Sequence, residues 1–139
     1  MRLDELPASA DAFLRGLRLA TIVQPHEPFP NAVPVWFTWT GDAIEFFTQP
    51  NRPKVGRLRR DPRVSVLISA EAAEPVYWVR IDGHAELHDD ATDLVAELTE
   101  RYLAVQPGDV SDMRERLLTA APDAVRVRVV PEQLWHFGG

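Results

Sequence analysis

The residues best suited to chemistry in this chain are basic and lie close together. A segment of twelve positions contains one acidic residue, Asp61, and six basic ones: Arg52, Lys54, Arg57, Arg59, Arg60 and Arg63. The segment carries a net charge of +5, whereas the whole chain carries −6. A cationic segment on an acidic chain predicts a local anion site rather than general affinity for polyanions. Lys54 is the only lysine in the chain, and lysine suits a site that needs a compact point charge.

Local structure would concentrate this charge at one end of a helix. Pro53 suits the first turn of a helix that we expect to run to about Arg60. Lys54 and Arg57 are three residues apart and would share one face. The helix N-terminus adds partial positive charge and free N–H groups. A phosphate placed there would meet Lys54, Arg52 from the preceding loop, and backbone donors.

Aromatic residues lie on the predicted strands beside this segment: Trp36, Phe37, Trp39, Phe46, Phe47 and Trp78. Alternation along a strand puts Trp36 and Phe37 on opposite faces, and likewise Phe46 and Phe47. About half of these rings therefore belong to the core, and the others face outward. An aromatic wall beside a phosphate site suits a flat, phosphorylated ring system.

Other catalytic chemistries have little support in the sequence. The chain has no cysteine, and no serine stands in a G-x-S-x-G motif. His84 and His88 are four apart on a predicted strand, which is not the spacing of helical metal ligands, so we expect no metal. Asp89 and Asp90 are explained as caps of a helix. We therefore assign no catalytic residue.

The predicted elements are mostly short strands. Strands are expected at 18–24, 32–39, 43–48, 63–70, 76–88 and 124–130, and 131–139 as a last short strand or loop. Helices are expected at 8–18 with Ser9 as the N-cap, at 53–60, from Asp89 or Asp90 to about 105, and at 111–120. The first three strands read as a meander with a turn at 41–42. Pro34 indicates an edge strand or a bulge, and Gly83 a bulge or bend. The pattern predicts one mainly β domain over 1–139 with short helices: an antiparallel split or closed barrel.

Composition narrows the class of protein further. No apolar run approaches the ~18 residues of a membrane span, and the N-terminus does not resemble a signal peptide. Without cysteine, a cytoplasmic location is expected. The net charge of −6 argues against a nucleic-acid partner.

Several motifs together resemble a known family. A strand with V-P-V-W-F is followed by one with I-E-F-F-T, then by N-R-P-K-V-x-x-L-R-R-D-P-R-V, and soon by Y-W-V-R-I-D-G-H-A-E-L. This order resembles the pyridoxamine 5′-phosphate oxidase-like split-barrel superfamily, and most closely its short members that use flavin or the deazaflavin coenzyme F-420. The similarity covers about residues 12–90 and, more weakly, the end of the chain.

The resemblance implies a homodimer with two cofactors, FMN or F-420, in clefts between the subunits. It places the phosphate against Arg52 and Lys54. Pro53 and Arg57 are also assigned to the cofactor site, with Arg57, Arg59 and Arg60 as a positive rim. It implies that Val35, Trp36 and Phe37 run along the ring, with Phe47 and Thr48 beside the ribityl chain, and that Trp78 reaches the cofactor. Trp135 would approach the partner's site. Pro53 stands where the pyridoxamine phosphate oxidases proper usually have Arg. Pyridoxamine phosphate is therefore not expected to be the substrate.

The leading hypothesis is an oxidoreductase that transfers a hydride between its cofactor and a small organic substrate. A protein that carries the same cofactor without turnover is the main alternative. Haem binding, known on related split barrels, is less favoured because no histidine has a ligand-like setting. Nucleic-acid binding through the arginines is the remaining alternative.

Overall fold

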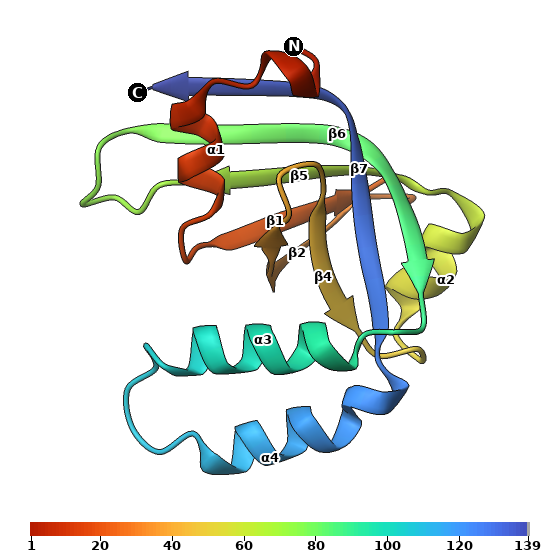
Figure 1. Ribbon diagram of the computed structural model, residues 1–139. Coiled ribbons are helices and arrows are strands. Elements are labelled where there is room, and N and C mark those ends of the chain that lie inside the picture. The colour runs from red at the N-terminus through yellow and green to blue at the C-terminus, as the bar shows by residue number, and fades with distance from the viewer. Residues whose placement is uncertain (139) are drawn as a thin grey trace.

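The computed structural model describes residues 1–138 and is built from seven strands and four α-helices (Figure 1). The strands are β1 Leu19–Gln24, β2 Asn31–Trp36, β3 Thr38–Trp39, β4 Ile44–Thr48, β5 Arg63–Ser69, β6 Tyr77–His88 and β7 Val125–Gly138. The helices are α1 Ala8–Leu14, α2 Pro53–Arg60, α3 Thr92–Leu103 and α4 Ser111–Ala120, with 3-10 turns at Leu3–Glu5 and Ala121–Asp123. All strand pairs are antiparallel. The prediction of a mainly β, antiparallel split barrel with short helices is confirmed.

Both pairings of the predicted meander are confirmed, but the prediction of one continuous strand over 32–39 is wrong, and the reason lies at Phe37. The strand order is β2-β1-β5-β6-β7-β4-β3, so β2 and β3 form opposite edges of the sheet. The segment expected as one strand, 32–39, breaks at Phe37: β2 pairs with β1, and β3 pairs with β4. One residue thus joins the two edges, which requires the sheet to curl round on itself. Pro34 does lie on an edge strand, opposite Thr21, as its missing N–H predicts.

The end of the chain is more regular than predicted. β7 is one continuous strand that pairs with β6 from Arg126 to Gly138 and with β4 from Val125 to Val129. The pairing with β6 shifts register between Asp82 and Gly83, which confirms the predicted bulge. At Gly83 a Cβ atom would stand 2.1 Å from the carbonyl oxygen of Val130. Only glycine allows the two strands to approach so closely.

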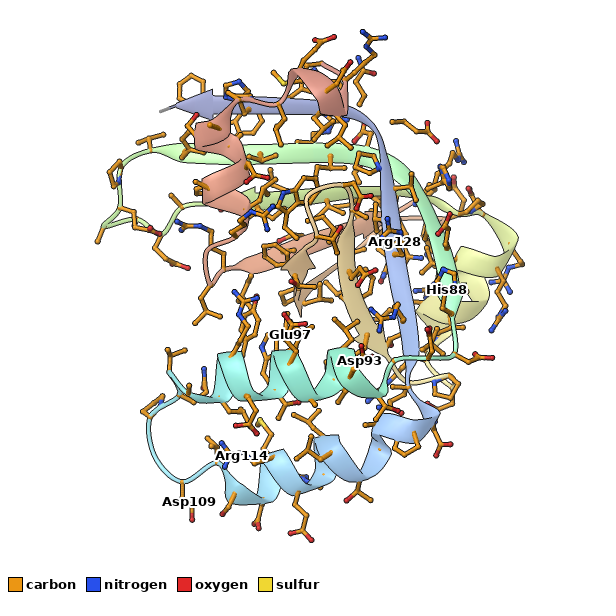
Figure 2. All side chains as sticks on the ribbon, viewed as in Figure 1. His88, Asp93, Glu97, Asp109, Arg114 and Arg128 are labelled. Carbon is orange, nitrogen blue, oxygen red and sulfur yellow. The ribbon has the colours of Figure 1, made fainter. Side chains whose placement is uncertain are left out.

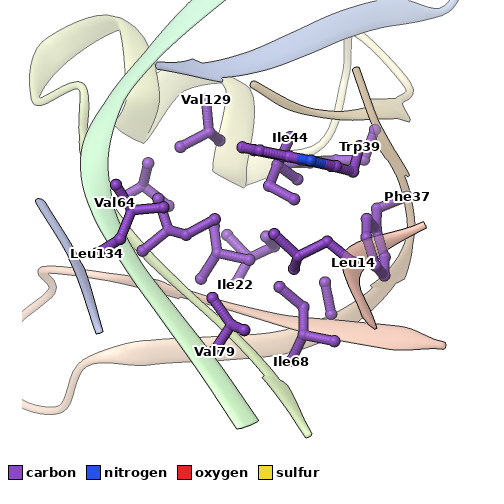
Figure 3. Close-up of a cluster of buried hydrophobic side chains, with 14 of the residues drawn as sticks. Leu14, Ile22, Phe37, Trp39, Ile44, Val64, Ile68, Val79, Val129 and Leu134 are labelled. Atoms are coloured by element: carbon purple, nitrogen blue, oxygen red, sulfur yellow. The ribbon is translucent and has the colours of Figure 1, made fainter. Parts of the chain in front are cut away.

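The barrel interior is filled by alternate residues of the strands and closed at one end by α1 (Figures 1 and 3). Ile22, Phe37, Val79 and Leu134 are among the fully buried side chains. Helix α1 buries Leu14 in this core. Ser9 is not its N-cap, because the helix begins at Ala8 and Pro7 is the N-cap. The Ser9 hydroxyl lies 3.3 Å from that of Tyr77.

Helices α3 and α4 form an antiparallel hairpin outside the barrel, below it in Figure 1. Leu94, Leu98 and Tyr102 of α3 are buried, as predicted, and pack against Trp36 and Phe47. The expected caps at Asp89 and Asp90 are not found, since Ala91 is the N-cap. The guanidinium of Arg126 instead fixes the position of this helix start: it donates to the Asp90 carbonyl at 3.0 Å and to the Asp93 carboxylate at 2.8 Å.

A partly buried ion-pair network connects this helical layer to the sheet. Glu45, on the outer face of β4, accepts from Arg126 at 2.7 Å and from Arg128 at 3.1 Å. Asp42 also accepts from Arg128, at 3.2 Å. Arg128 and Asp93 are labelled in Figure 2 on the side where the sheet meets the start of α3. Because Arg126 also holds the start of α3, the network fixes the helices beside β4.

Candidate functional site

A groove of about 780 Å³ lies between the sheet edge, the start of α2 and helix α4. Five of the residues predicted as a cofactor site line it: Val35, Trp36, Phe47, Arg52 and Lys54. The other lining residues are Leu19, Pro34, Gln49, Met113, Arg116, Leu117 and Ala120. This volume is in the range of pockets that hold small molecules and cofactors.

The start of α2 supplies the positive charge of the groove. Arg52 is the N-cap residue, no side chain caps the helix, and its first turn contains no acidic residue. Lys54 is half-buried, and its pKa is lowered from 10.5 by burial and then by the neighbouring charge of Arg52. The groove lining includes no carboxylate. An anion bound here would meet two cations and the positive end of the α2 dipole.

The buried amide of Gln24 helps to place this turn. Gln24 lies at the end of β1, is 2% exposed, and its side-chain amide donates to the carbonyl of Lys54 at 3.5 Å. The side chain of Asn31 donates in turn to Gln24 at 3.3 Å. The contact connects β1 to the first turn of α2, so the position of Lys54 depends on the sheet.

An aromatic wall stands beside the cations. Trp36 stacks on Tyr102 of α3, with ring centroids 5.1 Å apart and planes 7° from parallel. Phe47 comes from β4 and packs against α3. Phe37 and Phe46 are 1% and 0% exposed in the core, so the predicted division of each aromatic pair between two faces is confirmed. Trp36 and Phe47 are the members that leave the core.

The other predicted site residues lie outside the groove of the single chain. Phe37 belongs to the core, and Thr48 is buried on β4 next to Phe47. Pro53 begins α2, and Arg57 is one turn further along it. Trp78 is on β6, which is separated from β2 by β1 and β5. It stacks on Phe137, with the ring centroids 6.1 Å apart.

Sequence reasoning missed the side of the groove that α4 forms. Met113, Arg116, Leu117 and Ala120 recur at helical spacing and line it from α4. The helix was predicted at 111–120, but periodicity identifies a face without saying what that face meets.

The fold and the site can now be compared with known proteins. A model of the family described as pyridoxamine 5′-phosphate oxidase matches residues 6–136. The chain belongs to this family. A search of curated proteins finds no match.

Solved structures share the fold at low sequence identity. An F-420 reductase is 19% identical, with a TM-score of 0.73 over 94% of this chain and 98% of the other. A conserved hypothetical protein from Mycobacterium tuberculosis is 20% identical, with a TM-score of 0.71 over 99% and 89%. An FAD-binding protein from Mesorhizobium loti is 22% identical, with a TM-score of 0.66 over 94% of each. At this level of identity the likeness establishes the fold.

Residues 1–138 were also considered for membrane-spanning helices and for metal-ligand clusters. None of their helices combines the length and apolar character needed to span a bilayer. Within the same range, no group of three or more His, Asp or Glu side chains is placed to hold a metal ion.

Proposed function

We propose that this chain is an oxidoreductase that binds FMN or coenzyme F-420 in the groove and transfers a hydride to or from a small organic substrate. One observation carries the proposal: the uncapped start of α2, with Arg52 and Lys54 and no carboxylate, opens beside the exposed faces of Trp36 and Phe47. That arrangement fits a phosphate attached to a flat ring. Family membership and the flavin- and F-420-linked names of solved relatives support it.

Each part of the groove would have a distinct task. Arg52 and Lys54 neutralise the phosphate, and the free N–H groups of α2 donate to it. Val35, Trp36 and Phe47 contact the ring and exclude water from one of its faces. The bound cofactor supplies the hydride chemistry, so the protein's part is to bind and orient it. Thr48 follows Phe47 on β4, and Arg57 lies one turn beyond Lys54 on α2, so both would stand next to residues that bind the cofactor.

A homodimer would explain the residues that one chain leaves apart. Leu19, Leu67 and Phe137 are 51%, 42% and 57% exposed on the outer face of β1, β5 and β7. The half-buried Trp78 and Trp135 lie on the same face. An exposed apolar face of this kind is typical of an interface. Because it is continuous with the groove at Leu19 and Trp36, a second copy seated there would bring its Trp78 towards the cofactor.

The proposal is tested by titrating cofactor-stripped protein with F-420 and with FMN and following fluorescence. Saturable binding of either one, at one cofactor per chain and weakened in Lys54→Ala, supports the site. Binding of neither would overturn the function. Sedimentation at micromolar concentration then tests the dimer, since a monomer with bound cofactor would exclude a site shared between subunits.

A carrier and an enzyme would bind the cofactor through the same groove. They differ in turnover: an enzyme oxidises its reduced cofactor faster when a substrate is added, whereas a carrier does not. A screen of small organic acceptors with the reduced cofactor therefore separates the two functions.

A further inference from the structure

Helix α4 turns an unfilled face towards the groove. Met113, Arg116, Leu117 and Ala120 line the groove from this helix, whereas no residue of α4 is fully buried. Met113 is 44% exposed although it is a large apolar side chain. The face therefore lacks an apolar partner within residues 1–138, and a bound ring would supply one.

Arg116 on this face differs from its neighbour Arg114. Arg114 lies between α3 and α4 (Figure 2) and pairs with Glu100 of α3 at 3.1 Å. Arg116 forms no ion pair with any carboxylate of the residues that the structure describes. Arg52 and Lys54, on the opposite wall, are in the same situation within that range. Three cations from two separate elements thus border one groove that has no carboxylate in its lining.

Like charges around a shared groove repel one another when no anion is bound. One phosphate at the start of α2 can balance Arg52 and Lys54, which are two residues apart on one wall. It leaves Arg116 without a partner, because this side chain comes from the facing helix. The charge pattern of the groove therefore fits a ligand with negative groups in two places.

We propose that Arg116 is a second anion-binding residue of the groove and makes it selective for a phosphorylated ring ligand that carries a further negative group. This inference rests on the proposed function and refines it. FMN has a single phosphate, whereas F-420 has a phosphate and the carboxylates of its glutamate tail. Arg116 would bind the second group, and α4 would close against the ring through Met113 and Leu117.

The test compares F-420 and FMN affinities of the wild-type protein and three variants at low ionic strength. Arg116→Gln should weaken F-420 binding about tenfold, the usual size of a lost charge-assisted contact, and FMN binding less than about twofold. Arg116→Lys should recover most of the F-420 affinity. Arg114→Gln removes a charge from the same helix away from the groove, and should leave both affinities unchanged.

Several results would overturn the inference. Equal losses for the two ligands in Arg116→Gln would mean that the residue does not read the second negative group. No loss for either ligand would mean that it does not contact them, and a wild-type protein that binds FMN as tightly as F-420 would lack the selectivity. If these results appear while Lys54→Ala still weakens F-420 binding, only this inference fails. If the wild-type protein binds neither ligand, the proposed function fails with it.

Discussion

The hydroxyl group of Tyr102 takes the place of a strand partner for Phe37. It accepts a hydrogen bond from the backbone N–H of Phe37 at 3.2 Å. It donates one to the carbonyl of Arg18, with 2.5 Å between the two oxygens. Phe37 is the residue at which the chain leaves β2 on one edge and begins β3 on the other. Unpaired backbone groups are costly when buried, so the Tyr102 hydroxyl stabilises the chain where the strand breaks. The ring of the same side chain stacks on Trp36 of the groove.

Replacing Tyr102 by Phe should therefore cost stability while keeping the aromatic stack. The Phe37 N–H and the Arg18 carbonyl would lose their partner in a buried position, which is worth about 1–3 kcal/mol of unfolding free energy. Urea unfolding followed by fluorescence measures this change. A variant as stable as the wild-type protein would show that the hydroxyl does not satisfy these backbone groups.

The close approach of β6 and β7 predicts a second stability effect. Gly83→Ala would place its Cβ 2.1 Å from the Val130 carbonyl oxygen, so the bulge must open at a cost of about 1–3 kcal/mol. Gly56→Ala is the matched control in α2, because there the nearest atom to a new Cβ is the flexible guanidinium of Arg60 at 3.5 Å. It should gain about 0.5–1 kcal/mol. Thermal unfolding compares the two, and equal effects would contradict the close approach.

Cofactor affinity should fall on the alkaline side before the ordinary pKa of lysine is reached. Burial and then Arg52 lower the pKa of Lys54 from 10.5. A bound phosphate favours the protonated form, so affinity is constant below the Lys54 pKa and decreases as the pH rises through it. The decline should be smaller in Lys54→Arg, since arginine stays protonated; an identical decline in both proteins would place the titrating group elsewhere.

The same lowered pKa gives a sign for stability without cofactor. The folded chain releases the Lys54 proton more readily than the unfolded chain does. The unfavourable contribution is therefore complete below the folded pKa and disappears as the pH rises to 10.5. Between those two values, the unfolding free energy of the wild-type protein should rise relative to that of Lys54→Met. A fall across that window would contradict the direction of the shift.

Local signals in the sequence predicted one half of the groove. Pro53 marked the first turn of α2, and the run of basic residues around it placed Arg52 and Lys54 at one helix end. Alternation correctly predicted that one member of each aromatic pair leaves the core; the structure shows that these are Trp36 and Phe47. These are properties of neighbouring residues, and period and capping rules describe them well.

The other half depends on contacts between distant parts of the chain. The strand break at Phe37 is stabilised by Tyr102, sixty-five positions away. No residue near Phe37 in the sequence predicts the break. Arg126 of β7 donates to the Asp90 carbonyl at the start of α3, and the N-cap is Ala91 rather than Asp89 or Asp90. The groove face of α4 became visible only once the position of the helix was known. Trp78 remains a predicted cofactor contact that awaits a dimer structure.

The most direct test of the central claim is the F-420 affinity of Lys54→Ala compared with that of Arg59→Ala. Both variants remove one positive charge from α2, but Lys54 lines the groove and Arg59 is exposed outside its lining. The phosphate site predicts that Lys54→Ala loses about 1–3 kcal/mol of binding free energy, while Arg59→Ala changes affinity less than about twofold. Equal losses of affinity in the two variants would mean that only the net positive charge of α2 matters. An unchanged affinity of Lys54→Ala would show that the phosphate binds elsewhere.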